Sequence, residues 1–339
     1  MNHVIETHGL TRAYETYVKP EGLLNSVKGF WNRKVESKVA LHPTELSIEG
    51  GQIVGLVGGN GAGKTTLLKL LSGLIYPSGG EAKVLGFSPS ERKSDYLRQI
   101  SILLGQKNQL WWDIPPADSY DLLARIYDVD RTVAKKRVAE LADILQCTEL
   151  LNVQLRRLSL GERMKMEIIG SLLHRPRVLF LDEPTIGLDI VAQTTIREFL
   201  ADYVQREKPT VILTSHYMDD ISKLADRLLL ISQGRIVYDG SVDSFMANSE
   251  KRQRLTMKFV TPPAQDLVIA PDVSVVAGAL SLDVELAVKD IAPAIQRVMT
   301  MTAVEDLKIQ EADFEDVIRG FLEKESRLRQ TRSSLATRV

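Results

Sequence analysis

Cysteine is nearly absent from this 339-residue sequence, which contains only Cys147. A single cysteine cannot form a disulfide within the chain, and it cannot supply a cysteine-based metal cluster. Such low cysteine usage fits a reducing, cytosolic setting. We expect Cys147 to be a small buried apolar residue rather than a reactive thiol.

An excess of charge and a long apolar run are also missing. Lys and Arg number 43 and Asp and Glu 44, so the net charge is −1. This balance disfavours a protein that binds nucleic acid through a generally basic surface. No run approaches the length of about 18 apolar residues that a membrane-spanning helix needs. The first residues lack a basic start followed by an apolar stretch, so no signal peptide is expected.

The remaining composition is that of a globular protein. Hydrophobic residues make up 44% and charged residues 26% of the chain, which disfavours disordered and fibrous classes. The length predicts roughly two domains. It is sufficient for a full α/β core with an accessory domain.

Strand and helix patterns alternate along residues 1–240. Short apolar runs at Ile53–Val57, Val178–Leu181 and Val211–Thr214 are typical of buried strands. The segment 113–175 has mostly helical periodicity. This alternation predicts a parallel sheet with helices on its faces.

Three further segments differ from this core. Residues 19–38 form a basic insertion in which Leu23, Val27 and Trp31 have the spacing of an amphipathic helix. Residues 241–322 predict a small α+β domain, including a helix over Asp290–Met301 with Asp290 as its N-cap and another over Phe314–Leu322. Residues 323–339 are basic and predict a flexible tail.

A glycine-rich loop gives the strongest functional signal. Gly58–Thr65 matches the pattern G-x-x-x-x-G-K-[ST], and it lies between a predicted strand and a predicted helix. Glycines let the backbone approach a phosphate closely, and the N–H groups and the helix N-terminus attract the anion. The alternative is a glycine-rich loop without a ligand. The predicted nucleotide-binding residues of this segment are Gly58, Gly59, Asn60, Gly61, Ala62, Gly63, Lys64, Thr65 and Thr66.

Two carboxylates follow the apolar run Val178–Leu181. Asp182 and Glu183 are therefore expected at the carboxyl edge of the sheet, where ligands bind in open α/β folds. Asp182 would face Mg²⁺, and Glu183 would act as the general base for the attacking water. Ser159 and Glu162 fit a capping box, so Ser159 either only caps its helix or also binds a phosphate.

Taken together, these motifs resemble the nucleotide-binding subunit of an ABC transporter over about residues 4–240. The resemblance implies a P-loop NTPase core with an antiparallel β subdomain and a helical subdomain. It identifies Gly58–Thr65 as the Walker A motif, Leu158–Glu162 as the signature motif and Val178–Asp182 as the Walker B motif. Further positions match the Q-loop glutamine (Gln106), the catalytic glutamate (Glu183), the D-loop (Gly187-Leu188-Asp189), the switch histidine (His216) and an adenine-stacking aromatic (Tyr14).

The same resemblance implies the roles of these residues. Glu183, His216, Gln106 and Lys64 are expected to serve hydrolysis, and Thr65, Gln106 and Asp182 to hold Mg²⁺. Two copies would pair head to tail, with Ser159, Gly161 and Asp189 of one copy completing the ATP site of the other. A homodimer is expected, although a heterodimer stays open.

Two features distinguish the sequence within this family. Leu160 and Glu162 replace a glycine and a glutamine of the family's signature motif, while Ser159 and Gly161 are kept. The insertion 19–38 and the run Gln106–Asp113 resemble ABC-2 type exporter ATPases for drugs, viologen or polysaccharide. The resemblance therefore implies a separate membrane-spanning subunit, export, and a position at the cytoplasmic face of the membrane.

Other functions stay open at this stage. The chain could be an importer ATPase, or an ABC-type ATPase that acts on nucleic acid or ribosomes. The sequence lacks a long coiled coil between Lys64 and Asp182, and it has one glycine loop rather than two. Both observations favour transport, so no nucleic-acid partner is expected. A regulatory module without hydrolysis is disfavoured because Lys64, Asp182 and Glu183 are present.

Overall fold

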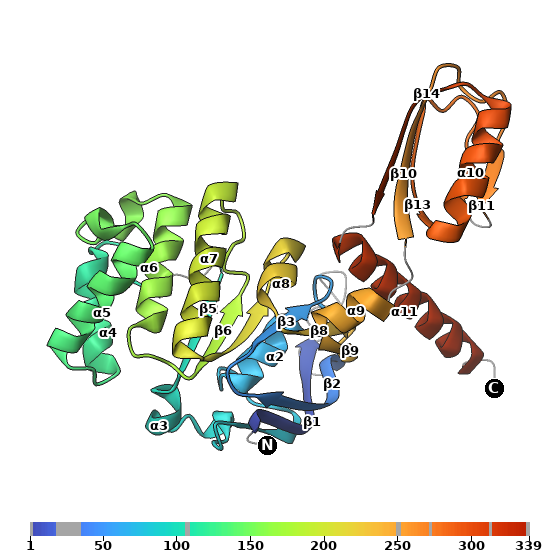
Figure 1. Ribbon diagram of the computed structural model, residues 1–339. Coiled ribbons are helices and arrows are strands. Elements are labelled where there is room, and N and C mark those ends of the chain that lie inside the picture. The colour runs from blue at the N-terminus through green and yellow to red at the C-terminus, as the bar shows by residue number, and fades with distance from the viewer. Residues whose placement is uncertain are drawn as a thin grey trace, which may run out of the picture. The chain divides into compact units, whose positions relative to one another are not determined.

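The computed structural model describes residues 3–17, 35–105, 109–248, 252–270, 273–311 and 314–336. Internal contacts divide it into two units, Met1–Val242 and Asp243–Val339 (Figure 1). The division falls close to the boundary predicted after residue 240. No helix in the described ranges combines the length and the apolar character needed to cross a bilayer.

A six-stranded sheet in the order β5-β6-β7-β3-β8-β9 forms the centre of the first unit. Its first five strands are parallel, and β9 is antiparallel to β8 at the edge. β3, β6 and β7 are buried along their whole length, as parallel strands covered on both faces should be. The strands are β3 (Ile53–Val57), β5 (Ile100–Leu104), β6 (Val178–Asp182), β7 (Thr210–Thr214), β8 (Arg227–Ser232) and β9 (Arg235–Ser241).

Helices connect these strands and bury apolar side chains against them. One core cluster joins Leu67 and Leu68 of α2 to Leu56, Phe180 and Ile212 of the sheet. The predicted α/β core is therefore confirmed. The connecting helices are α2 (Lys64–Leu71), α3 (Ser94–Leu97), α7 (Ile190–Glu207), α8 (Met218–Leu224) and the 3₁₀ helix η1 (Pro89–Glu91).

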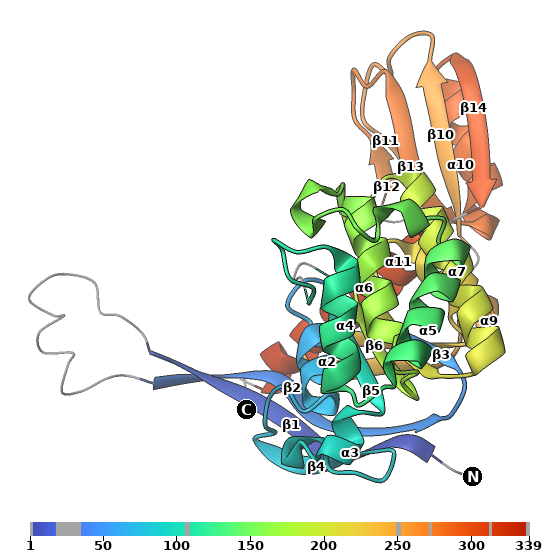
Figure 2. The ribbon, with the colours of Figure 1, turned by 90° about the vertical axis from the view of Figure 1, so that its left-hand side faces the viewer.

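The predicted antiparallel subdomain is a three-stranded sheet in the order β2-β1-β4. Its strands are β1 (His3–Tyr17), β2 (Val35–Glu49) and β4 (Gly79–Val84). β1 and β2 form a long ribbon (Figure 2). Residues 35–38 belong to β2 rather than to the predicted insertion helix, and the rest of the insertion up to residue 34 lies outside the described residues.

The predicted helical subdomain lies between β5 and β6 in the chain. Asp130 caps α5 by accepting hydrogen bonds from the backbone N–H groups of Thr132 and Val133. Cys147 is completely buried here, as predicted, and burial raises the pKa of its thiol to about 11. The elements are α4 (Pro116–Ile126), α5 (Arg131–Ile144), η2 (Thr148–Leu150), η3 (Leu155–Arg157) and α6 (Leu160–Leu172).

The second unit contains a three-stranded antiparallel sheet in the order β13-β10-β14 and a hairpin, β11-β12. Helix α10 packs against β10, β11 and β13. In α9, Phe245 makes edge-on ring contacts with Phe314 and Phe321 of α11. The elements are α9 (Val242–Asn248), β10 (Arg252–Phe259), β11 (Leu267–Ala270), β12 (Val273–Val275), β13 (Ser281–Ala287), α10 (Val288–Met301), β14 (Val304–Glu311) and α11 (Phe314–Ala336).

Two details of this unit differ from the sequence-based expectation. Ala287 is the N-cap of α10, and Asp290 lies in its first turn, because β13 leads directly into the helix. Helix α11 continues past Leu322 to Ala336, where a tail was predicted. That segment contains no Pro or Gly, and its Glu, Leu, Arg and Gln residues all favour a helix.

Candidate functional site

The glycine loop connects β3 to α2 at the carboxyl edge of the parallel sheet. Gly58 cannot carry a side chain, because a Cβ there would lie 2.1 Å from the carbonyl oxygen of Ile231. Gly63 has a φ of +113°, and its Cβ would lie 2.7 Å from the carbonyl oxygen of Ala40. Both glycines are therefore required by the packing of the loop between β8 and the β2 strand.

Lys64 begins α2 and turns back over the loop. Its Nζ donates hydrogen bonds to the carbonyl oxygens of Gly58, at 2.7 Å, and Gly59, at 3.3 Å. The residue is only 6% exposed. Burial lowers the pKa of Lys64, while the neighbouring carboxylates of Glu183 and Asp182 act in the opposite direction. The ammonium group is thus held where a phosphate would meet it.

Asp182 connects the glycine loop to two strands. Its Oδ2 accepts a hydrogen bond from Thr65 Oγ1 at 2.9 Å, and its Oδ1 accepts one from Thr214 Oγ1 at 2.8 Å. The side chain is 8% exposed. A threonine hydroxyl and a carboxylate lie side by side as a pair of hard oxygen donors. Thr214, at the end of β7, was not among the predicted site residues.

Glu183 is held next to this pair in an unusual backbone conformation. Its φ is +58°, which is a strained region for a residue with a Cβ. The backbone N–H of Glu183 donates to both the carbonyl and the hydroxyl oxygen of Thr214, at 3.1 and 3.0 Å. His216 Nε2 lies 2.9 Å from Glu183 Oε1. The fold therefore brings the two residues together from separate connections.

The segment predicted to contain the Q-loop starts in contact with Asp182. Gly105 N donates to the carbonyl oxygen of Asp182 at 2.7 Å. A Cβ on Gly105 would lie 2.6 Å from the carbonyl oxygens of Asp182 and Glu183, so only glycine fits. Gln106 itself lies outside the described residues, and its predicted role stays a prediction.

The predicted signature residues begin α6. Ser159 Oγ accepts from Glu162 N at 3.3 Å, and Glu162 Oε2 accepts from Ser159 N at 2.8 Å, which confirms the capping box. Leu160 is 44% exposed and approaches the D-loop, since a Cβ on Gly187 would lie 3.3 Å from Leu160 Cδ2. A Cβ on Gly161 would lie 3.0 Å from that of Ala192.

Asp189 and Tyr14 belong to different elements of the first unit. Asp189 is the N-cap of α7, and its Oδ1 accepts from Ala192 N at 2.9 Å. Tyr14 lies on β1 in register with Lys38 and has the guanidinium of Arg12 4.7 Å from its ring centroid. Stacking of Tyr14 on adenine stays a prediction.

Comparison with known proteins identifies the family. Residues 41–186 match the family model for ABC transporters. The sequence is 32% identical over 222 residues to the ABC transporter ATP-binding protein NatA of Bacillus subtilis (strain 168), and the match covers 66% of this chain and 89% of NatA. The chain belongs to the ABC transporter family. It is an ATP-binding subunit that hydrolyses ATP to power a transporter, and such a subunit works with a membrane partner.

Further similarities agree with this family assignment. The sequence is 33% identical over 202 residues to the Nod factor export ATP-binding protein I of Cupriavidus pinatubonensis (strain JMP 134 / LMG 1197), covering 60% of this chain and 62% of that protein. Among solved structures, the dimeric bacterial ABC transporter cassette MJ0796 matches with a TM-score of 0.59 at 21% identity. That match covers 70% of this chain and 98% of the cassette, and it supports the fold.

A buried acidic residue of this ABC-family ATPase was missed by the sequence analysis. Asp220, in α8, is 1% exposed. Its Oδ2 accepts hydrogen bonds from Ser215 Oγ, at 2.7 Å, and from Thr185 Oγ1. Its Oδ1 accepts from Arg197 of α7 at 2.8 and 3.0 Å. Asp220 thus connects the residue before His216 to the segment between Glu183 and the D-loop.

We expect Asp220→Asn to lower kcat for ATP by ~10-fold or more, because His216 and the D-loop lose their common support. The KM for ATP should stay within about threefold, since Asp220 does not line the glycine loop. Leaving the Arg197 charge unpaired should also cost about 3 kcal/mol of stability. Steady-state kinetics and thermal unfolding measure both effects.

Asp219→Asn is the matched control for that variant. Asp219 precedes Asp220 but is exposed and pairs with Lys223 at 2.8 Å. Its replacement should change neither kcat nor the melting temperature appreciably. A normal kcat in folded Asp220→Asn enzyme would contradict the positioning role.

Glu167 is a second buried carboxylate that the sequence analysis missed. It lies on α6, is 4% exposed, and accepts hydrogen bonds from the backbone N–H of Gln109 at 3.0 and 3.1 Å and of Leu110 at 3.3 Å. Burial raises its pKa, and these hydrogen bonds oppose the shift. Glu167 therefore connects the backbone at Gln109 and Leu110 to helix α6 by hydrogen bonds.

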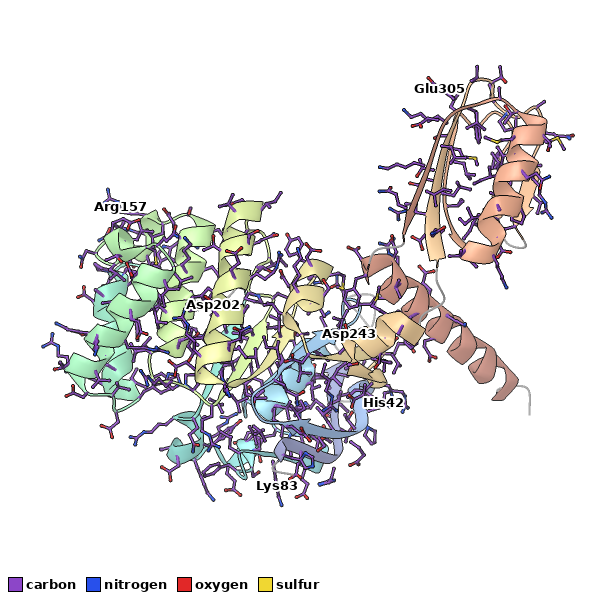
Figure 3. The ribbon with its side chains drawn as sticks, in the orientation of Figure 1. His42, Lys83, Arg157, Asp202, Asp243 and Glu305 are labelled. Atoms are coloured by element: carbon purple, nitrogen blue, oxygen red, sulfur yellow. The ribbon has the colours of Figure 1, made fainter. Side chains whose placement is uncertain are left out.

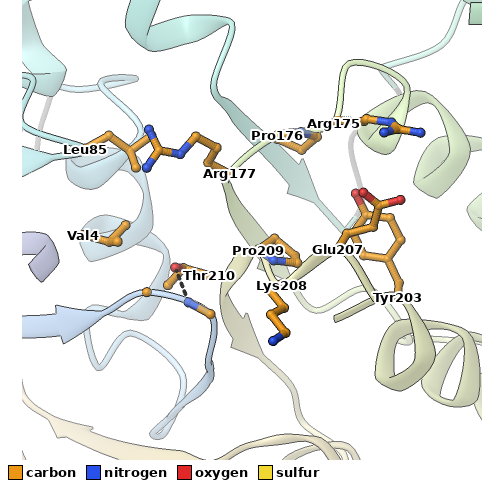
Figure 4. Close-up of a pocket in the computed structure, with 12 residues that line it drawn as sticks. Val4, Leu85, Arg175, Pro176, Arg177, Tyr203, Glu207, Lys208, Pro209 and Thr210 are labelled. Carbon is orange, nitrogen blue, oxygen red and sulfur yellow. Dashed lines mark hydrogen bonds between the residues drawn. The ribbon is translucent and has the colours of Figure 1, made fainter. Parts of the chain in front are cut away.

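A cavity of about 410 Å³ lies away from the glycine loop, at the amino ends of β6 and β7. Its rim includes Arg175, Arg177 and Lys208. Figure 4 shows these three side chains pointing in different directions rather than toward one centre. The cavity therefore lacks the convergent charges of an anion site.

Proposed function

We propose that this chain is the ATPase subunit of an exporter, and that two copies enclose Mg²⁺-ATP and drive a separate membrane-spanning subunit from its cytoplasmic face. The observation that carries the proposal is the meeting of Lys64, Thr65, Asp182, Glu183 and His216 at one edge of the sheet. They come from three connections: Lys64 and Thr65 follow β3, Asp182 and Glu183 lie at the end of β6, and His216 follows β7. Together they provide a cation, a pair of oxygen ligands, a base and a base-orienting imidazole.

Magnesium fits the oxygen pair formed by Thr65 and Asp182. Their Oγ1 and Oδ2 atoms are 2.9 Å apart, and hydroxyl and carboxylate oxygens are the ligands that Mg²⁺ prefers beside phosphates. When bound, Mg²⁺ would neutralise charge on the β- and γ-phosphates. The described residues contain no cluster of three or more His, Cys, Asp or Glu side chains suited to a metal.

Glu183 supplies the base in the proposed hydrolysis. Its carboxylate takes a proton from the water whose oxygen attacks the γ-phosphorus, and ADP leaves as the bond to the γ-phosphate breaks. His216, at 2.9 Å, fixes the direction of that carboxylate. Lys64 donates hydrogen bonds to the phosphate oxygens in place of the loop carbonyls that it contacts here.

A homodimer would complete each ATP site. Ser159, Gly161 and Asp189 lie at or beside the N-termini of α6 and α7, where N–H groups and helix dipoles favour a phosphate. The dimeric arrangement of the cassette MJ0796 supports this proposal. Export rather than import is favoured by the Nod factor export relative.

The membrane-spanning subunit is proposed to contact Trp111. Trp111 is 43% exposed and lies in the segment that Glu167 fastens to α6. Exposed tryptophans are common anchors of protein interfaces. The neighbouring Trp112 is a less suitable probe, because the guanidinium of Arg163 lies 4.3 Å from its ring centroid and packs against it.

When the tagged chain is isolated from solubilised membranes, we expect Trp111→Ala to reduce the amount of membrane subunit recovered with it by ~10-fold. The reason is that the interface loses one anchor residue. ATP hydrolysis by the isolated chain should stay within about twofold, since Trp111 makes none of the contacts of the glycine loop. Tyr76→Ala replaces an aromatic residue elsewhere in the unit that is 55% exposed, and it should leave recovery unchanged. Equal recovery with both variants would refute docking at Trp111.

The proposed function is tested by isolating the tagged chain from detergent-solubilised membranes. A membrane-spanning protein should be recovered in fixed proportion with it, and ATP hydrolysis by the complex should require Mg²⁺. Recovery of ribosomes or DNA instead would contradict the transport proposal.

A further inference from the structure

Strand β14 of the second unit is an edge strand (Figure 1). In the order β13-β10-β14, its outer side pairs with no other strand in the described ranges. It runs from Val304 to Glu311 without Pro, and its pairing with β10 shifts register only at Lys258/Phe259. Such a regular edge exposes unpaired N–H and C=O groups that can pair with another strand.

The two faces of β14 differ in polarity. Leu307 and Ile309 are in register with Met257 and Leu255, which are fully buried. Ile309 is nevertheless 43% exposed, because α10 packs over β10, β11 and β13 rather than over this edge. An apolar strip therefore continues from the core of the unit to its edge.

The other face carries complementary charges in a symmetric order. Asp306 and Lys308 flank Leu307, and both side chains are exposed. In a two-fold antiparallel pair of identical strands, residues on the same face lie opposite each other. If Leu307 is the centre, Asp306 of each copy lies opposite Lys308 of the other. Centring on Asp306 or Lys308 would instead place like charges together.

The opposite edge of the sheet cannot pair in this way. On β13, Asp283 and Glu285 flank Val284 on one face. Self-pairing centred on Val284 places Asp283 opposite Glu285, and the adjacent centres place each acid opposite itself. Both acids also interact with Arg254 of their own chain, at 3.6 and 3.2 Å. Charge therefore selects β14 over β13.

We propose that β14 is a self-association surface, on which a second copy of this chain adds its own β14 in antiparallel register about Leu307. The two sheets then form one continuous six-stranded sheet. Leu307 packs on its counterpart, and Ile309 lies opposite Glu305 of the second copy. This association uses no nucleotide, so it is separate from the ATP-dependent pairing proposed above.

Cysteine cross-linking of the full chain without nucleotide tests the register. Leu307→Cys should form a disulfide-linked dimer on mild oxidation, because directly opposite residues have Cβ atoms about 5 Å apart. Cys147 is buried with a raised pKa and will not compete. Glu305→Cys is the control (Glu305 is labelled in Figure 3). Its two copies would be about 14 Å apart, too far for a disulfide.

Charge exchange tests the surface independently. Asp306→Lys and Lys308→Asp should each weaken the nucleotide-free dimer by roughly tenfold or more, because each places two like-charge pairs in the interface. Mixing the two variants should restore dimers, since every pair is then of opposite sign. Sedimentation velocity measures the association.

Two results would overturn the proposal. One is a wild-type chain that stays monomeric without nucleotide and a Leu307→Cys variant that does not cross-link. The other is retention of the dimer by both charge variants. Lys64→Ala should leave the nucleotide-free dimer unchanged while it weakens ATP binding. Failure of the β14 proposal and failure of the proposed ATP site therefore give different results.

Discussion

Glu183→Gln is expected to reduce ATP hydrolysis by roughly 10²- to 10⁴-fold, the contribution of a general base. The carboxamide has the shape of the carboxylate and can still accept a hydrogen bond from His216, but it cannot take the proton from water. The backbone of Glu183 should be unchanged, because its φ of +58° is fixed by two hydrogen bonds to Thr214. Phosphate release by the purified variant measures the effect.

ATP should remain bound to the Glu183→Gln chain, and paired chains with ATP should accumulate. Glu198→Gln, an exposed residue on α7, is the control and should hydrolyse ATP at the normal rate. If the Glu183→Gln variant released phosphate near the wild-type rate, Glu183 would not be the general base.

Lys64→Ala should lower ATP affinity by ~100-fold, equivalent to about 3 kcal/mol for a buried, hydrogen-bonded cation. The expected loss is large because Lys64 is 6% exposed and no second lysine or arginine of the described residues donates to the glycine loop carbonyls. Titration calorimetry with ATP and Mg²⁺ measures the affinity.

Lys69→Ala provides the matched control on the same helix. Lys69 lies in the last turn of α2, away from the N-terminal turn that is proposed to bind the phosphates. Its replacement should leave ATP affinity unchanged. Normal ATP affinity in folded Lys64→Ala chains would show that the glycine loop is not the phosphate site.

The local parts of the site could be predicted from the sequence. The residues of Gly58–Thr65 are contiguous, and so are those of the apolar run that ends at Asp182. Each stretch by itself therefore predicts both a secondary-structure element and the ligand chemistry beside it. Predicted strands such as Ile53–Val57 match the observed bounds. The length of β1 and β2 could not be predicted from the sequence, because their outward residues are polar and only pairing with each other makes them long strands.

The tertiary contacts that position the site residues could not be predicted from the sequence. Asp220 follows His216 by four residues, but nothing local shows that it is buried or that Arg197 lies against it. The support of Glu183 by Thr214 likewise depends on β6 and β7 being neighbours. Burial and strand order are tertiary properties, and these residues become visible only with the fold.

The capping box at α6 also affects how a phosphate can bind there. The amide of Ser159 already donates to the Glu162 carboxylate, so only the hydroxyl proton of Ser159 is free to meet an incoming oxyanion. An anion arriving at this helix end must also approach a resident negative charge. In the proposed dimer, a phosphate that binds at this helix end therefore competes with the Glu162 carboxylate, which favours release of the phosphate after ATP is split.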